Sequence, residues 1–480
     1  MRDKIKQLES TSRLLDPDQK QRALWDQQVL DYTNAFLANL EVNKTFNSNL
    51  EQGRAISEFN ITEQPTDLAN LLEGTTKNID DVGINPGSGG HMGYIPGGGL
   101  YPSALGDYIA AISNRYAGIF YAAPGAVRLE NMLIRWMCDL MEYPATSLGN
   151  LTSGGSIANL VAIVTARDAI NLKSRDFERA VIYLSEQAHH SVQKALRIAG
   201  MSEAQLRYIP MDDGLRLSVS ALENAIREDK ANGLLPFFIN SSFGTTNTGA
   251  IDPLDSIADL AEQHKIWFHV DASYGGFFKL VEEIEPKFKG IARADSITLD
   301  PHKTLFLPFG SGAILIKDGS LLFKTHHYLA EYMQDTVDAN EEVSPADISP
   351  ELTKHFRGMR LWLPLKLFGL APFRSALKEK LLLAQYFHRR IQTMKGFEVG
   401  PDPELSVAMF RYLPKLEDAN SFNKALIKAI QDDGRIFLSS TTIDGIFWIR
   451  VAVVVFRTHL EHVDLLLEII GQKVKELRQS

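Results

Sequence analysis

The sequence contains a single cysteine, Cys138, among its 480 residues. One cysteine cannot form a disulfide within the chain, and it cannot supply the paired thiolates of a Cys-x-x-Cys metal site. Disulfides are typical of oxidising compartments, so we expect this protein to work in a reducing one, the cytoplasm. The first ten residues alternate in charge and include no apolar stretch of signal-peptide length, which agrees with that location.

Long apolar runs, a basic excess and metal-ligand spacing are also missing. The apolar run 451–456 is far shorter than the roughly 20 residues that cross a bilayer. Fifty Lys and Arg against 59 Asp and Glu leave a net charge of −9, whereas nucleic-acid binding needs clustered positive charge. The histidine pairs at 189–190 and 326–327 are adjacent rather than one helical turn apart. We therefore expect no membrane, nucleic-acid or metal partner.

What is present is the composition of a globular α/β protein. Hydrophobic residues make up 45% of the chain and charged residues 23%, which is enough for a substantial core. Between about residues 150 and 317, apolar runs rich in β-forming residues alternate with helical stretches. This alternation predicts a mostly parallel central sheet covered by helices. The predicted strands are 180–184, 236–243, 266–270, 296–299 and 312–316.

The sequence on either side of this region has different residue patterns. Apolar residues at helical spacing over 13–50 predict an amphipathic helix that needs a partner. The segment 85–99 is so rich in glycine that we predict a loop and place the first boundary there. Helical patterning and two short strands, 407–412 and 447–455, follow the central region. We predict an N-terminal helical segment over 1–90, a large domain over 91–350 and a small C-terminal α+β domain over 351–480.

Two chemically active side chains follow predicted strands. Asp271 directly follows the strand 266–270, and Lys303 lies just beyond the strand 296–299. The carboxyl ends of parallel strands meet at one edge of a sheet, where ligands bind. Taken alone, such an aspartate is more often a turn or cap residue, and a lysine is more often a surface charge. Lys303, however, lies between two apolar runs, and burial favours a nucleophilic amine.

Three more segments are predicted to end at the same edge. Gly155 and Ser156 open an apolar helix, so they form either a phosphate-binding turn or an ordinary serine cap. His189 and Thr246 each follow another strand. A phosphate cradle, a carboxylate, an amine and a flat imidazole together fit pyridoxal 5′-phosphate. The lysine would bind the cofactor covalently, the aspartate would keep its pyridine nitrogen protonated, and the histidine would stack on its ring.

Four motifs carry these residues: His269-Val-Asp-Ala-Ser-Tyr-Gly-Gly, Asp300-Pro-His-Lys303, Ser185-Glu-Gln-Ala-His189-His-Ser and Phe243-Gly-Thr-Thr246. With them, the chain resembles the group II pyridoxal-phosphate-dependent amino-acid decarboxylases over about residues 85–460. This family includes the aromatic-L-amino-acid, glutamate, histidine and 2,4-diaminobutyrate decarboxylases. The resemblance implies an α/β fold of PLP-dependent fold type I. It also implies release of carbon dioxide from an L-amino acid to leave an amine, and a homodimer with its active site at the interface.

The resemblance also implies a role for each matching residue. The catalytic residues would be Lys303, which holds the cofactor, His189, and Tyr328, which would donate a proton after carbon dioxide leaves. Tyr332 lies one helical turn from Tyr328 and is the alternative donor. The cofactor would also be bound by Gly155 and Ser156 at the phosphate, Thr246 near the ring, Asp271 at the pyridine nitrogen, Ala272 or its neighbour on the far ring face, and His302 between lysine and phosphate.

Substrate contacts are implied for Tyr94, Phe120 and Arg450, although for Arg450 a structural ion pair is an equal alternative. The aromatic side chains near position 94 and position 120 favour an aromatic amino acid. Arg115 and Arg128 lie near the same stretch, so an acidic or diamino acid (glutamate, aspartate or 2,4-diaminobutyrate) is the second possibility. The alternative hypotheses are a different fold-type I lyase or aminotransferase, and an inactive binding module.

Asp300 departs from the aromatic-amino-acid decarboxylases, which usually have asparagine before Pro-His-Lys. A carboxylate beside a phosphate dianion is repulsive unless it is protonated or paired. We therefore expect Asp300 to point away from the phosphate or to act as a turn residue.

Overall fold

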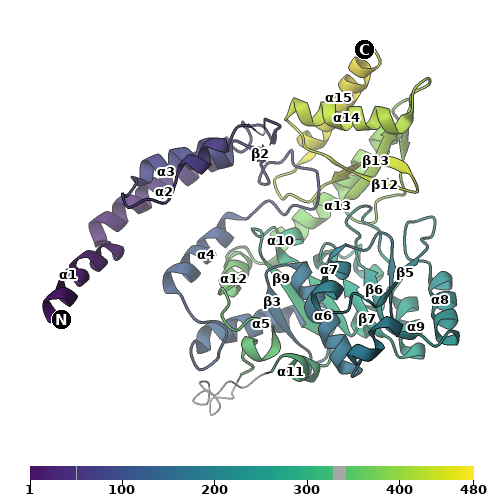
Figure 1. Cartoon of the computed structure of the whole chain (residues 1–480). Helices are drawn as coiled ribbons and strands as arrows, with labels where there is room; N and C mark the ends of the chain where they lie inside the picture. The colour runs from purple at the N-terminus through teal and green to yellow at the C-terminus, as the bar shows by residue number, and fades with distance from the viewer. Residues whose placement is uncertain (50, 328–341, 480) are drawn as a thin grey trace.

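A seven-stranded sheet lies at the centre of the protein (Figure 1). The computed structural model describes residues 1–49, 51–327 and 342–479. The strand order is β3-β9-β8-β7-β6-β4-β5, and β9 alone runs antiparallel to its neighbours. The predicted mostly parallel sheet is confirmed. Its strands are β3 (Leu148–Thr152), β4 (Ala180–Ser185), β5 (Gln205–Ile209), β6 (Leu235–Ser242), β7 (Trp267–Asp271), β8 (Ser296–Leu299) and β9 (Gly312–Ile316).

Helices cover both faces of this sheet because its central strands are apolar on both sides. In β4, Val181 and Tyr183 belong to one buried cluster, whereas Ile182 and Leu184 belong to the other. This alternation follows from the two-residue period of a strand. One cluster contains residues of α5 (Pro124–Leu140), α8 (Val219–Ala231) and α9 (Leu254–His264), and the other contains residues of α6 (Gly155–Ala169), α7 (Ser191–Ile198) and α11 (Ser320–His326).

Two strands of the sheet were not predicted. β5 is an edge strand with polar residues, and it therefore lacks the continuous apolar run that identifies a central strand. β3 contains Gly149 and Asn150, two residues that are depleted in strands. A Cβ at Gly149 would come within 2.3 Å of the Ile314 carbonyl oxygen on the paired strand β9, so close backbone approach explains the glycine.

The C-terminal region forms a four-stranded antiparallel sheet in the order β10-β11-β13-β12. Its own buried cluster joins this sheet to three helices, as expected for a small α+β domain. The helix α12 (Gly358–Phe368) packs on α4 (Tyr101–Ser113) of the large domain. The elements of the small domain are α13 (Leu370–Gln392), β10 (Phe397–Val399), β11 (Val407–Tyr412), α14 (Ala419–Asp433), β12 (Ser439–Ile443), β13 (Ile446–Ala452) and α15 (Leu460–Leu477).

The first 39 residues form an arm that projects away from the body (Figure 1). The arm consists of α1 (Arg2–Ser12) and α2 (Gln19–Asn39), and no residue of either helix is buried. The predicted helix over 13–50 therefore begins later and ends earlier than expected. The chain returns along the arm through α3 (Leu68–Thr75), and two-residue strands β1 (Phe46–Asn47) and β2 (Gly83–Ile84) pair at its base.

Candidate active site

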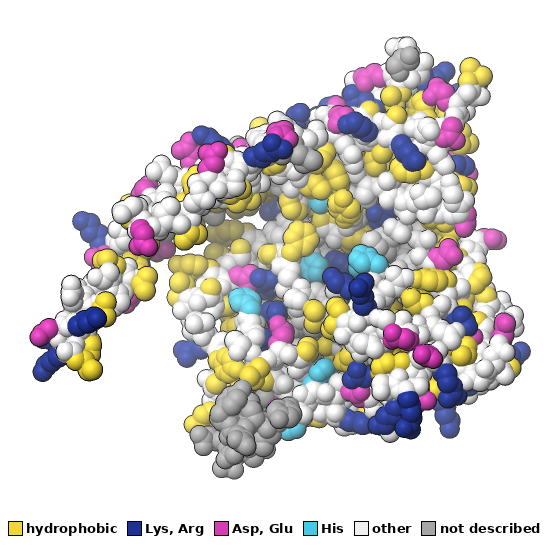
Figure 2. Space-filling view, in the orientation of Figure 1, with side chains coloured by type: hydrophobic (Ala, Val, Ile, Leu, Met, Phe, Trp, Pro, Cys, Tyr) yellow, Lys and Arg dark blue, Asp and Glu magenta, His cyan; other side chains and the backbone are white. Residues whose placement is uncertain are grey.

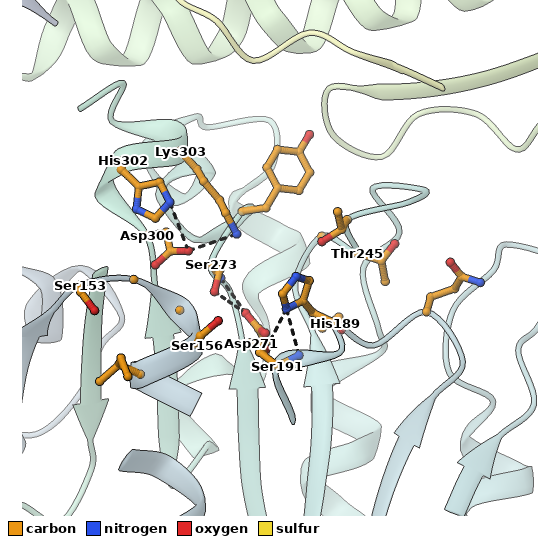
Figure 3. A pocket seen from close by; sticks show the side chains of 18 of the residues that line it. Ser153, Ser156, His189, Ser191, Thr245, Asp271, Ser273, Asp300, His302 and Lys303 are labelled. Carbon is orange, nitrogen blue, oxygen red and sulfur yellow. Dashed lines mark hydrogen bonds and ion pairs between the residues drawn. The ribbon is translucent and has the colours of Figure 1, made fainter. Parts of the chain in front are cut away.

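The carboxyl ends of β3, β4, β6, β7 and β8 surround a cavity of about 320 Å³ (Figure 3). The strand ends that were expected to meet at one edge of the sheet do meet here. Small and hydroxyl side chains make up much of the lining. It consists of Ser153, Gly154, Gly155, Ser156, Ile157, Gln187, His189, Ser191, Ser242, Gly244, Thr245, Thr246, Asp271, Ser273, Tyr274, Asp300, His302, Lys303 and Gly310.

Lys303 enters the cavity from the one-turn helix α10 (Pro301–Thr304). Its Nζ lies 3.1 Å from Oδ2 of Asp300, and its side chain is 20% exposed. Asp300 itself is buried, and among the described residues its Oδ1 has no hydrogen-bond partner. The expectation that Asp300 points away from the phosphate is wrong: the carboxylate faces into the cavity beside Gly155, as the counter-charge of the lysine (Figure 3).

Asp271, at the end of β7, is held by several donors. Its Oδ1 accepts hydrogen bonds from the backbone N–H and the hydroxyl of Ser273, at 3.1 Å and 2.6 Å. Its Oδ2 accepts one from Nδ2 of Asn159 at 2.9 Å. Burial acts to raise the pKa of Asp271, but the charge of Lys303 and these hydrogen bonds outweigh it, so the pKa lies below its usual value. The carboxylate is therefore ionised and can hold a protonated nitrogen.

His189 lies in the loop between β4 and α7, on the same side of the cavity as Asp271 (Figure 3). Its Nδ1 is 2.8 Å from the hydroxyl of Ser191. Burial lowers the pKa of His189, and the nearby Asp271 carboxylate only partly offsets this effect. The ring is therefore a neutral, flat imidazole at neutral pH, which suits stacking on an aromatic ring.

The turn before α6 has the geometry of an anion cradle. Gly154 precedes the helix at φ +149°, a conformation that side chains disfavour. A Cβ at Gly155 would come within 2.7 Å of the Ser273 hydroxyl and 3.0 Å of Asp300, so only glycine leaves this space open. Within the described chain, no side chain caps α6, and its first N–H groups remain available to a phosphate.

His302 completes this side of the cavity. Its Nδ1 donates to the Ser311 carbonyl at 2.6 Å, and its Nε2 lies 3.8 Å from Oδ2 of Asp300. The open glycine cradle, the ionised Asp271, the flat His189 and the amine of Lys303 fit the phosphate, ring nitrogen, ring face and aldehyde of pyridoxal 5′-phosphate.

The structure places Thr246 and Ala272 differently with respect to the cavity. Thr246 lines it. Ala272 is fully buried and does not line it, and a Cβ at Gly276 would meet the Ala272 methyl at 3.3 Å. Its neighbour Ser273 lines the cavity instead.

Arg450, on β13, lies outside the cavity lining and is only 2% exposed. Its Nε donates to the Asn247 carbonyl and its NH1 to the Ser439 hydroxyl, both at 2.7 Å, and its NH2 donates to the Thr246 carbonyl. Burial lowers the pKa of Arg450 to about 10, so it is still a cation at neutral pH. Its hydrogen bonds join the small domain to the loop that carries Thr246.

Tyr94 and Phe120 also do not line the cavity of this chain. Tyr94 is 56% exposed and packs on Phe437 at 5.7 Å between ring centroids. Phe120 is buried, and the Arg128 guanidinium lies 4.9 Å from its ring centroid. Tyr328 and Tyr332 lie outside the described residues.

The sequence interpretation missed Asn159, which bonds Asp271, and Ser191, which bonds His189. The signal for Asn159 was an amide within the apolar stretch of α6, one turn after Gly155. Such a residue is buried and must find hydrogen-bond partners. The segment 85–99 was correctly assigned as loop, and a Cβ at Gly97 would lie 2.3 Å from the His302 carbonyl oxygen. The glycine therefore lets this loop pack against α10.

The described residues contain neither a metal-ligand cluster nor a membrane-spanning helix. No three His, Cys, Asp or Glu side chains are grouped there so that they could hold a metal ion. None of the helices in the described ranges has the length and apolar character to cross a membrane.

Known proteins match this chain over most of its length. A family model for the pyridoxal-dependent decarboxylase conserved domain matches residues 51–413. An aromatic-L-amino-acid decarboxylase of Bacillus atrophaeus is 34% identical, and the alignment covers 94% of this chain and 93% of that relative. A phenylacetaldehyde synthase of Petunia hybrida is 29% identical over 95% and 94% of the two chains. The structure of Catharanthus roseus tryptophan decarboxylase in complex with L-tryptophan has the same fold, with a TM-score of 0.89, 24% identity, and coverage of 96% and 99%.

Proposed function

Because this chain belongs to the pyridoxal-dependent decarboxylases, we propose that it removes carbon dioxide from an aromatic L-amino acid to give the corresponding amine. The single observation that carries the proposal is the juxtaposition of Lys303, the ionised Asp271 and the open glycine cradle in one cavity. The choice of an aromatic substrate is supported by the 34% identity to an aromatic-L-amino-acid decarboxylase over nearly the whole of both chains.

Pyridoxal 5′-phosphate, when bound, supplies an electron-withdrawing ring that accepts the electron pair left by the departing carbon dioxide. Lys303 would hold the cofactor covalently through its amine. Asp271 keeps the proton on the ring nitrogen, since its own pKa is lowered. His189 would lie against the ring, and the first N–H groups of α6 together with His302 would bind the phosphate. We assign the final proton donation to Tyr328.

We further propose that the protein acts as a homodimer. The arm exposes large apolar side chains that a monomer leaves in water, including Leu24, Trp25 and Leu30 at 54%, 40% and 47% exposure. Apolar side chains are visible both on the arm and on the facing edge of the body (Figure 2). In the dimer, Tyr94 and Phe120 of one subunit would contact the substrate in the other. We place the enzyme in the cytoplasm, because its one cysteine, Cys138, is buried and unpaired.

The proposal is tested by incubating the purified holoenzyme with separate amino acids and measuring carbon dioxide, amine and aldehyde. We expect amine from L-tryptophan, L-tyrosine or L-phenylalanine, and much less from L-glutamate, L-aspartate or L-2,4-diaminobutyrate. The Lys303→Ala variant should lose the visible absorbance of the bound cofactor and at least about 10³-fold in rate, because the covalent attachment is gone. Aldehyde as the main product, or a preference for the acidic or diamino acids, would contradict the proposal.

A further inference from the structure

One buried amide, that of Asn159 on α6, hydrogen-bonds Asp271 directly and is connected to His189 through Ser191. Its Nδ2 donates to Oδ2 of Asp271 at 2.9 Å and to the hydroxyl of Ser191, also at 2.9 Å. That hydroxyl lies 2.8 Å from Nδ1 of His189. Asn159 is only 1% exposed and does not line the cavity, so it acts through these neighbours rather than on the cofactor.

The other end of the amide is also bonded. Oδ1 of Asn159 accepts a hydrogen bond from Oγ1 of Thr298 at 2.7 Å and lies 3.1 Å from Nε2 of His269. Nδ1 of His269 lies 2.7 Å from the hydroxyl of Ser296, which accepts from Nε1 of Trp267 at 2.8 Å. A chain of buried polar groups therefore runs from Trp267 across β7 and β8 to Asn159.

The hydrogen bonds of this series run in one direction from Trp267 to the amide of Asn159. The indole N–H of Trp267 donates to the hydroxyl of Ser296. Because Oδ1 of Asn159 only accepts, the single proton of a neutral His269 lies on Nε2, and Nδ1 accepts a hydrogen bond from the Ser296 hydroxyl. Burial lowers the pKa of His269 to about 4, so the ring is neutral and its proton lies on Nε2. This N–H donates to Oδ1 of Asn159, because a carbonyl oxygen only accepts.

The same logic continues beyond the amide. With its oxygen turned to His269, Asn159 directs its N–H groups to Asp271 and Ser191. Ser191 then donates its hydroxyl proton to Nδ1 of His189, which also accepts the backbone N–H of Ser191 at 3.3 Å. His189 therefore carries its own proton on Nε2. The reverse orientation of the amide would put its oxygen against the Asp271 carboxylate, two acceptors with no proton between them.

We propose that Asn159 is a positioning residue that holds Asp271 as an ionised acceptor and His189 as the Nε2–H tautomer, so that one amide sets both groups that meet the cofactor ring. This role rests on the cofactor of the proposed function and is independent of which amino acid is the substrate. It predicts effects on cofactor binding and on the spectrum of the bound cofactor, before any substrate is added.

The test compares Asn159→Leu with the unmodified protein by titrating each apoprotein with pyridoxal 5′-phosphate. We expect the dissociation constant to rise by about 10-fold, the effect of losing one hydrogen bond to a charged group. We also expect the pH midpoint of the bound cofactor's absorbance band to move up by about one unit. Without Asn159, Asp271 supports the positive charge of the pyridine nitrogen less well. A less positive ring repels the second proton of the cofactor less, so the pH at which that proton is lost rises.

The matched control is Asn423→Leu in the small domain. Asn423 is fully buried, and its amide bonds the backbone N–H and carbonyl of Tyr412, both at 2.8 Å. This variant loses comparable buried hydrogen bonds, but its folded fraction should bind the cofactor with unchanged affinity and spectrum. If Asn159→Leu does not fold, Thr298→Val removes one of the two donors to Oδ1 with little change in shape, and we expect about a threefold rise in the dissociation constant.

A folded Asn159→Leu with the unmodified affinity and absorbance midpoint would overturn the inference. So would an unchanged Thr298→Val if Asn159→Leu does not fold. Failure of the proposed function is a different result, since it would appear as the absence of amine from every aromatic amino acid while these cofactor measurements still differed between the variants.

Discussion

At the residue scale, burial and nearby charge have opposite effects on the pKa of Asp271. Burial disfavours the ionised form of every carboxylate in the cavity, yet Asp271 stays ionised because donors and the Lys303 ammonium surround it. Asp300 is buried against the same lysine, with one oxygen that no described residue bonds. The two carboxylates therefore depend on one cation.

We expect Asp300→Asn to bind pyridoxal 5′-phosphate more tightly. The carboxylate of Asp300 lies against the cradle at Gly155, where it repels a phosphate dianion, whereas an asparagine oxygen would still accept a hydrogen bond from Lys303. The dissociation constant should fall by about threefold, the effect of removing a partly screened repulsion. Titration of the apoprotein with the cofactor at pH 7.5 measures this constant. Weaker binding by the variant would show that the ion pair of Asp300 with Lys303 contributes more to cofactor binding than the repulsion of the phosphate costs.

A second residue-scale prediction concerns His91, in the glycine-rich loop. It is 3% exposed, and no described residue hydrogen-bonds either ring nitrogen. Burial lowers its pKa to about 4, from 6.5, so the unfolded chain binds the extra proton between these values and stability falls as the pH drops through this window. From pH 7 to pH 5, His91 should cost about 2 kcal/mol.

His91→Leu should therefore lose about 2 kcal/mol less than the unmodified protein over the same pH change. Urea unfolding at pH 7 and pH 5 gives the two free energies of unfolding. An identical pH dependence in both proteins would mean that His91 is not a buried neutral histidine.

At the element scale, β13 and the loop after β6 are joined by Arg450. Three nitrogens of this cation donate to groups of both domains, and its burial leaves no water to replace them. Because the loop also carries Thr246, the contact connects the docking of the small domain to the shape of the cavity.

We expect Arg450→Met to lower the free energy of unfolding by about 3 kcal/mol, because it leaves buried carbonyl groups without donors. The control Arg435→Met removes a 49% exposed arginine paired with Asp433, and should change stability by less than about 1 kcal/mol. Denaturant unfolding at neutral pH compares the three proteins. Equal stability of the two variants would rule out the role of Arg450 as a link between domains.

At the scale of the whole molecule, the arm packs on α3 but leaves much of its own apolar surface exposed. Its helices bury no residue, although α2 alone exposes five large apolar side chains. Their association with a second copy would remove apolar surface from water, at roughly 25 cal/mol per Å². These side chains are Leu24, Trp25, Val29, Leu30 and Phe36.

The double variant Trp25→Asp and Leu30→Asp should sediment as a monomer at micromolar concentration, because two carboxylates would be buried in the interface. Ile61→Asp, at a fully exposed single position, is the control and should sediment as the unmodified protein does. A double variant that remains a dimer would place the interface elsewhere.

The sequence by itself determined the layers and the chemistry of this protein. Apolar runs of strand length predict the central strands because a strand buried on both faces is mostly apolar, and five of the seven were found this way. Residues that follow such strands, above all Asp271 and Lys303, could be placed at one edge because parallel strands share their direction. Edge strand β5 and the glycine-containing β3 were missed, since neither has that pattern.

Only the tertiary structure decided which way side chains face and what they bond. The sequence interpretation turned Asp300 away from the site, whereas the fold pairs it with Lys303, and it left Asn159 unnoticed within an apolar helix. The hydrogen bond of Asn159 joins it to Asp271, 112 positions away, and even the neighbouring pair Asp300 and Lys303 takes its orientation from the strand ends that surround it. A local sequence pattern predicts whether a segment is a helix or a strand and which of its residues are buried. A contact between distant segments forms only when the chain folds.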